Sequence, residues 1–106
     1  NSFQKDIAAE ALYFKAERLH SLKKYKASNL IIERISGSSG QLGDWNAKAL
    51  LLLAKNYYAL NDPFQASFVL ESVIENFIAF PFVIEEAKSL LVTYKASAAK
   101  ENRSIN

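Results

Sequence analysis

One pattern of large and small residues occurs twice in this 106-residue chain, at positions 38 residues apart. LYFKAERL, which begins at Leu12, matches LLLLAKNY, which begins at Leu50, and SNLII from Ser28 matches ASFVL from Ala66. A repeat of this length is typical of helix pairs that cannot bury their apolar faces alone and therefore stack on one another. An ordinary helical bundle with coincidental spacing is the alternative. The other equivalent pairs are Ala16 with Ala54, Leu19 with Tyr57, Ile32 with Leu70 and Ile35 with Val73.

Glycine and proline mark the limits of the predicted helices. The three glycines lie between Gly37 and Gly43, and the two prolines are Pro63 and Pro81. Elsewhere apolar residues recur at steps of three and four, which is the spacing of one helix face. We therefore predict an all-α fold of about five helices, with breaks near 35–44, 61–62 and 79–81. The first helix is expected over about 3–22, and the polar tail 99–106 is expected to fray.

Two aspartates are predicted to begin helices. Asp44 can accept hydrogen bonds from the unpaired amide groups of a helix that extends to about Leu60. Asp62 precedes Pro63, and proline suits the first helical position because an N–H there would lack an intrahelical partner anyway. Within each helix pair, the small residues Ala16 with Ser28, and Ala54 with Ala66, are expected to let the two backbones approach closely.

The composition limits the classes of protein to which the chain can belong. Half of the residues are apolar, which supplies a modest core, and 13 Lys and Arg balance 11 Asp and Glu, so no nucleic-acid partner is expected. The apolar runs 49–54 and 77–84 are far shorter than the roughly 20 residues that span a bilayer. Without cysteine there is no disulfide or thiolate chemistry. Methionine is absent even from position 1, which predicts a fragment of a longer chain.

No constellation suited to catalysis is found. His20 has no second histidine and no cysteine with which to complete a transition-metal site. Glu85 and Glu86 are adjacent, so on a helix they point about 100° apart and do not share a proton. The glycine-rich segment 36–43 lacks the lysine of a phosphate-binding loop. We therefore predict a protein that is not an enzyme, with no catalytic residue, no cofactor and no metal.

The repeated pattern resembles the tetratricopeptide repeat, a helix pair whose first helix carries large-x2-Leu-small-x2-aromatic and whose second carries a small residue and then a large one. The second copy places Leu53, Ala54 and Tyr57 in this pattern, whereas the first has Lys15 where the family prefers leucine. The resemblance implies antiparallel helix pairs in a right-handed solenoid, within one domain over 1–106. Repeat one would cover about 9–36, repeat two about 44–77, and a third half-repeat or capping helix about 81–100.

In the family that the chain resembles, the first helix of each pair lines a concave groove that binds a peptide or protein partner. The resemblance therefore implies a non-enzymatic interaction module or scaffold. The segment 61–77 also resembles repeats of bacterial cell-envelope proteins, which implies a periplasmic or outer-membrane-associated location. Relatives that clamp a carboxylate use lysine and asparagine where this chain has Tyr13 and Glu17, so no carboxylate clamp is expected. The predicted groove residues are Glu10, Tyr13, Glu17, His20, Lys48, Leu51, Lys55, Tyr58, Phe82 and Glu85.

A second hypothesis concerns the segment FIAFPFVI, residues 77–84. Its apolar residues surround one proline and present more apolar surface than a corner of a small domain can easily cover. An exposed apolar patch of this kind marks an interface. This hypothesis makes the chain a structural or oligomerisation segment of a larger protein that self-associates weakly through an edge contact at Phe80 and Phe82.

Overall fold

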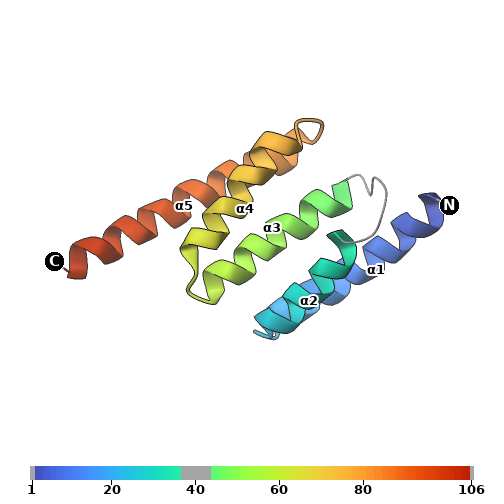
Figure 1. Ribbon diagram of the computed structural model, residues 1–106, viewed down its shortest axis with the longest axis horizontal. Helices are drawn as coiled ribbons and strands as arrows, with labels where there is room; N and C mark the ends of the chain where they lie inside the picture. The colour runs from blue at the N-terminus through green and yellow to red at the C-terminus, as the bar shows by residue number, and fades with distance from the viewer. Residues whose placement is uncertain (1, 37–43, 106) are drawn as a thin grey trace.

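The computed structural model describes residues 2–36 and 44–105, and within these ranges the chain forms five α-helices and no strand. The helices are α1 (Ser2–Ser21), α2 (Tyr25–Ser36), α3 (Asp44–Ala59), α4 (Pro63–Asn76) and α5 (Pro81–Ile105) (Figure 1). The predicted all-α fold is confirmed, as are the breaks at 61–62 and before Pro81. The predicted break near 35–44 falls mainly on residues 37–43, which lie outside the described residues, whereas Ile35 and Asp44 at its limits are helical.

The two turns within helix pairs, α1 to α2 and α3 to α4, use the same hydrogen bonds at equivalent positions. The amide of Lys24 donates to the carbonyl of Leu19 at 2.8 Å, and 38 residues later Asp62 donates to Tyr57 at 2.9 Å. Between them, Lys23 and Asn61 have positive φ, at 63° and 65°. A residue in the left-handed conformation after a helix lets the backbone amides there donate to the last carbonyls of the helix, which would otherwise lack partners. The internal repeat therefore extends to the backbone of the turns.

Helix starts follow the predicted residues closely. An Asp62 carboxylate oxygen accepts from the amide of Gln65 at 3.1 Å, and Pro63 occupies the first turn of α4, as predicted. Asp44 is itself the first residue of α3, and its carboxylate pairs with Lys48 Nζ at 3.2 Å, one turn further on. The tail predicted to fray is helical to Ile105 instead. No glycine or proline follows Pro81, and alanines support a helix there.

The helices form two layers. In one layer α3 contacts α1 on one side and α5 on the other, and the three helices run in the same direction (Figure 1). In the second layer α2 contacts α1 and α3, while α4 contacts α3 and α5. The molecule is consequently elongated, with extents of 55 × 30 × 17 Å. The helix α3 contacts all four of the other helices and is the centre of the stack.

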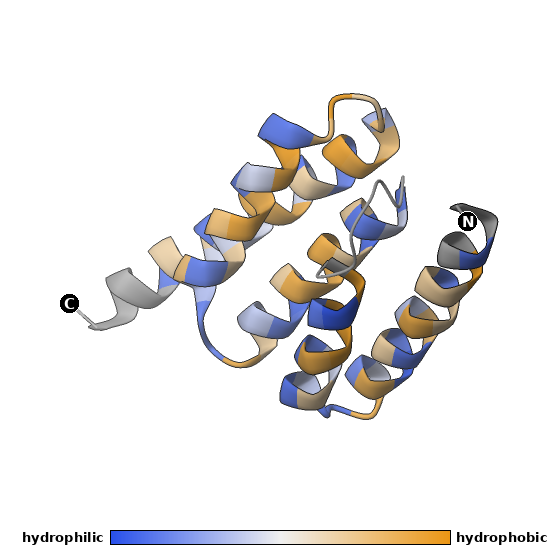
Figure 2. Cartoon of the chain, turned by 45° about the vertical axis from the view of Figure 1, so that its right-hand side comes forward, coloured by the Kyte–Doolittle hydropathy of each residue, from blue (hydrophilic) through white to orange (hydrophobic). Residues whose placement is uncertain are grey.

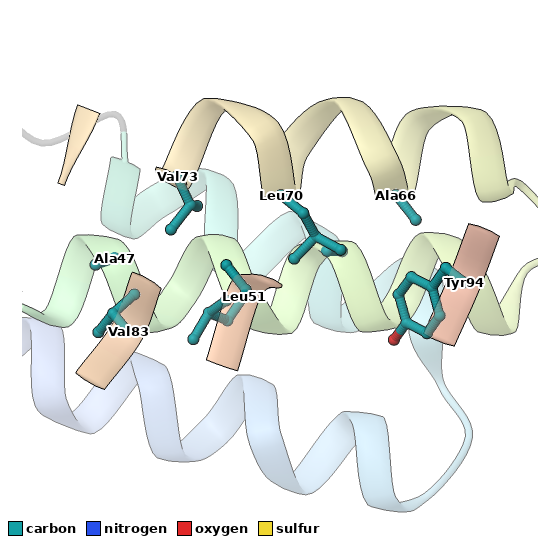
Figure 3. Close-up of a cluster of buried hydrophobic side chains, with 9 residues drawn as sticks. Ala47, Leu51, Ala66, Leu70, Val73, Val83 and Tyr94 are labelled. Atoms are coloured by element: carbon teal, nitrogen blue, oxygen red, sulfur yellow. The ribbon is translucent and has the colours of Figure 1, made fainter. Parts of the chain in front are cut away.

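The core is divided into two clusters that correspond to the two helix pairs. One cluster joins α1 and α2 to one side of α3, and the other joins α4 and α5 to the opposite side. Figure 3 shows Ala66, Leu70 and Val73 of α4 directed at α3. Equivalent residues of the two pairs are buried alike: Ala16 and Ala54, Ile32 and Leu70, and Ile35 and Val73 are all fully buried.

The close approach predicted for the small residues is confirmed in the first pair. Ser28 Oγ donates to the backbone carbonyl of Ala16 at 2.7 Å, and both residues are fully buried. In the second pair, Ala54 and Ala66 are fully buried in one cluster. Apolar and polar residues alternate around the helices (Figure 2). Over the described residues, no helix is both long and apolar enough to cross a membrane.

Candidate interaction groove

The junction between α3 and α5 holds three contacts between polar or aromatic side chains. Lys55 Nζ lies 3.0 Å from a carboxylate oxygen of Glu86. The ring of Tyr58 stacks on Tyr94, with centroids 3.9 Å apart and planes 5° from parallel. The Tyr58 hydroxyl donates to Ser97 Oγ at 2.7 Å. These contacts hold α5 against α3, and they give the layer of α1, α3 and α5 a polar surface at this junction.

A hollow of about 460 Å³ lies at the start of this junction. Its walls come from the beginning of α3 and from the corner that leads into α5. Phe82 is 91% exposed, so its ring is available to a ligand, whereas Val83 is buried. The ion pair of Asp44 with Lys48 adds charge to the apolar walls. The lining residues are Asp44, Lys48, Ala79, Phe80, Pro81, Phe82 and Val83.

A smaller hollow of about 150 Å³ lies at the other end of the same junction. It is lined by Tyr58, Asn61, Pro63, Ser97 and Ala98, and it offers hydroxyl and amide groups in place of phenylalanine rings. Lys48 and Tyr58 are ten positions apart on α3, which corresponds to about 15 Å along a helix. The ion pair of Lys55 with Glu86 lies between these two positions.

An aromatic cluster joins α1 to the start of α3. The rings of Tyr13 and Trp45 have centroids 5.6 Å apart, Phe14 lies 6.1 Å from Trp45, and Lys48 Nζ sits 4.7 Å from the centroid of the Trp45 ring. The pKa of Tyr13 is raised to about 12, mainly because the phenol is buried and also because Glu17 is negatively charged and hydrogen-bonded to it. Burial raises the pKa of Tyr94 as well, and the charge interaction with the neighbouring Tyr58 adds to the effect. Both phenols therefore remain neutral donors at physiological pH.

The structure separates the predicted groove residues into four groups. Tyr13, Lys48, Lys55, Tyr58 and Phe82 lie along the α1/α3/α5 layer in the contacts just described. Leu51 is only 4% exposed and belongs to the core, so it is a packing residue. Glu10, Glu17 and Glu85 are exposed, and His20 is half-buried in a different contact.

His20 belongs to a network of hydrogen bonds between helices. Its Nδ1 lies 2.6 Å from Asn56 Oδ1, which accepts from the ring N–H. The Asn56 amide nitrogen donates to Ser28 Oγ at 2.9 Å and to Asn29 Oδ1 at 2.8 Å. Asn56 is fully buried, and its network joins α1, α2 and α3. Within the described residues, no three His, Cys, Asp or Glu side chains form a group that could hold a metal ion.

Sequence reasoning missed Glu86, Trp45 and Ser97. It chose Glu85, but a neighbouring residue on a helix points about 100° away, and Glu86 is the one that meets Lys55. The internal repeat could have found Glu86, because it stands 38 positions after Lys48.

Of the two residues predicted as an edge contact, Phe82 is exposed as expected. Phe80 is instead partly buried, and its ring lies 6.4 Å from that of Phe77.

Comparison with models of protein families, with curated proteins and with solved structures finds no significant match to this chain.

Proposed function

We propose that this chain is a non-enzymatic interaction module of the tetratricopeptide type, which binds an extended peptide segment of a protein partner along the α1/α3/α5 layer. The observation that carries the proposal is the pair of hollows at the two ends of the α3–α5 junction. One hollow is lined mainly by apolar residues and the other by polar groups, so a ligand would have a defined direction along the groove.

The distance between the two hollows determines the length of the peptide segment that fits. An extended chain advances about 3.3 Å per residue, so about 15 Å corresponds to four or five residues. We therefore expect a peptide with a large apolar residue beside Phe82 and a hydrogen-bonding residue beside Tyr58 and Ser97, four or five positions away. Buried aromatic anchors supply most of the binding energy in such interfaces, and the charges between them fix the register.

A selection from random peptides tests this proposal. The folded 106-residue chain is immobilised, peptides are enriched from a display library, and the affinity of the best peptide is measured by fluorescence anisotropy. Phe82→Ser should weaken binding by about tenfold or more, since it removes an apolar contact. Phe64→Ser is the matched control, because Phe64 is also strongly exposed, at 80%, but lies on α4.

The charged residues of the groove supply a second arm of the experiment. Lys48→Glu with Lys55→Glu should impair binding while circular dichroism shows unchanged helix content. In the Lys55→Glu variant the new carboxylate faces that of Glu86 and repels it, which can lower stability. The melting curve of this variant must therefore be recorded together with its affinity. Peptides that bind Phe82→Ser and the double lysine variant as well as they bind the wild type would refute the proposed groove.

Self-association is the second candidate function, and it rests on the corner between α4 and α5. Ile78 is 78% exposed and Phe82 is 91% exposed, so both are available to a second copy. Phe80 packs against the core, and its replacement would test folding instead. Sedimentation equilibrium of Ile78→Ser with Phe82→Ser should show a shift from dimer to monomer. A wild type that is strictly monomeric at high concentration would exclude this candidate.

A further inference from the structure

The ion pair of Lys55 with Glu86 lies in the middle of the proposed peptide groove. Lys55 is on α3 and Glu86 is on α5, and their charged atoms are 3.0 Å apart. Along α3, Lys55 stands between Lys48, which borders one hollow, and Tyr58, which borders the other. A peptide that fills both hollows therefore passes over this ion pair.

The ion pair leaves hydrogen-bonding capacity on both side chains. The Lys55 side chain is 36% exposed and the Glu86 side chain is 48% exposed, so each contacts water as well as its partner. An ammonium group has more than one N–H donor and a carboxylate has more than one lone pair, and the contact between them occupies only one of each. A ligand can therefore bond to both side chains without breaking the pair.

The charge of Glu86 acts on tyrosines at both sides of α3. Burial is the main cause of the raised pKa of Tyr13 on α1, and the charges of Glu17 and then Glu86 add to it. Burial is also the main cause for Tyr94 on α5, where Tyr58 and then Glu86 add to the raised pKa. Since α1 and α5 lie on opposite sides of α3 (Figure 1), the Glu86 carboxylate is directed over the α1/α3/α5 layer, where a peptide in the groove would meet it.

The pair matches an amide group better than a charged group. Its opposite charges largely cancel at a distance, so it attracts a single charged side chain only weakly. At short range it presents a donor next to an acceptor. An extended backbone carries the complementary groups, because the N–H and the C=O of one residue point to the same side of the chain, as they do where two residues of an antiparallel ladder exchange both hydrogen bonds.

We propose that Lys55 and Glu86 form a main-chain clamp on one residue of the bound peptide. The backbone N–H of that residue donates to the Glu86 carboxylate, and its C=O accepts from the Lys55 ammonium. This inference rests on the proposed peptide groove and specifies how the segment between the two hollows is recognised. The side chain of the clamped residue contributes little to affinity, whereas proline is excluded there because it has no N–H.

Ester substitution in the peptide obtained by selection tests the clamp. Each residue between the two anchoring side chains is replaced in turn by the corresponding α-hydroxy acid, which exchanges the N–H for an oxygen and adds no bulk. Affinity is measured by fluorescence anisotropy. One of these esters should weaken binding to the wild-type chain by about tenfold or more, because it deletes a hydrogen bond to a charged acceptor. Alanine at the same position should leave the affinity nearly unchanged.

Variants of the chain identify the partners of the backbone groups. On Glu86→Met, the ester that weakens wild-type binding should cause no further loss, because the N–H has no carboxylate to meet there. Lys55→Met should weaken binding of the all-amide peptide. Glu71→Met is the matched control, since Glu71 also pairs with a lysine of α5, at 3.6 Å from Lys95 Nζ, and is similarly exposed, but it lies on α4. The ester should remain harmful on this control.

The clamp and the groove fail in different ways. A peptide whose binding depends on Phe82 but tolerates an ester at every position between the anchors would overturn the clamp and leave the groove standing. An equal effect of the ester on Glu86→Met and on the wild type would also overturn the clamp, because another group would then accept from the N–H. So would a loss on alanine substitution that no ester reproduces, since the pair would then bind a side chain. If no selected peptide depends on Phe82, the groove and the clamp are both refuted.

Discussion

Asn56 is the residue at which the two helix pairs meet. It lies on α3, is fully buried, and bonds to His20 of α1 and to Ser28 and Asn29 of α2. A buried amide is costly unless its groups are paired, and here the oxygen has one partner and the nitrogen has two. The network also accounts for His20, whose ring is held between helices and packs 5.3 Å from Tyr25, centroid to centroid.

Asn56→Ala should lower the free energy of unfolding by about 1–3 kcal/mol, because it leaves the partners of the amide without their hydrogen bonds inside the stack. Asn76→Ala is a suitable comparison, since Asn76 is exposed and bonds to Ser72, one turn away on the same helix. Urea unfolding followed by circular dichroism measures both. Similar losses for the two variants would show that the Asn56 network contributes little.

Tyr13 should make stability depend on alkaline pH. Burial and Glu17 raise its folded-state pKa from 10.0 to about 12, so the neutral phenol is favoured in the folded chain. The stabilisation is fully present below pH 10 and is lost as the pH rises from 10 toward 12, because the unfolded chain releases this proton first. Relative to Tyr13→Phe, the wild type should therefore lose free energy of unfolding across that window. Parallel pH profiles for the two proteins would contradict this.

At the scale of helices, packing within each pair depends on small residues. Ala54 and Ala66 are fully buried between α3 and α4, so Ala54→Leu or Ala66→Leu should destabilise the fold by about 1–3 kcal/mol through overpacking. Ala59→Leu provides the control, because Ala59 is exposed at the end of the same helix. Thermal melts are sufficient for this comparison. Unchanged melting of both buried variants would mean that the helices tolerate wider separation.

The helices were largely predictable, and the groove only in part. Apolar spacing, Pro63 and Pro81 predicted the elements because these signals act locally along the chain. The candidate groove depends on the rotation of each helix about its axis, which the sequence does not give; Glu85 was predicted there, and Glu86, one position on, is the residue that pairs with Lys55. Leu51 and His20 were placed on the groove from the family pattern, but tertiary packing decides whether a residue faces a core cluster, a buried network or water.

At the scale of the whole molecule, the stack is asymmetric. Its α5 end presents Glu85 and Lys88, whereas its α1 end presents Ile7 and Phe14, and the α3–α5 junction lies between them. Because α3 contacts every other helix, we expect the two helix pairs to unfold together. Any ligand that crosses the α1/α3/α5 layer would meet side chains from three parallel helices.

Mapping a selected peptide by NMR shows whether the α1/α3/α5 layer is the surface that binds it. The chain is labelled with ¹⁵N, the peptide obtained by selection is added, and backbone amide shifts are followed through the titration. The largest changes should occur at Lys48, Lys55, Phe82 and Ser97, because these residues border the two hollows and the ion pair between them. Changes confined to Leu30, Phe64 and Phe68 on the outer surfaces of α2 and α4 would contradict a binding groove in the α1/α3/α5 layer.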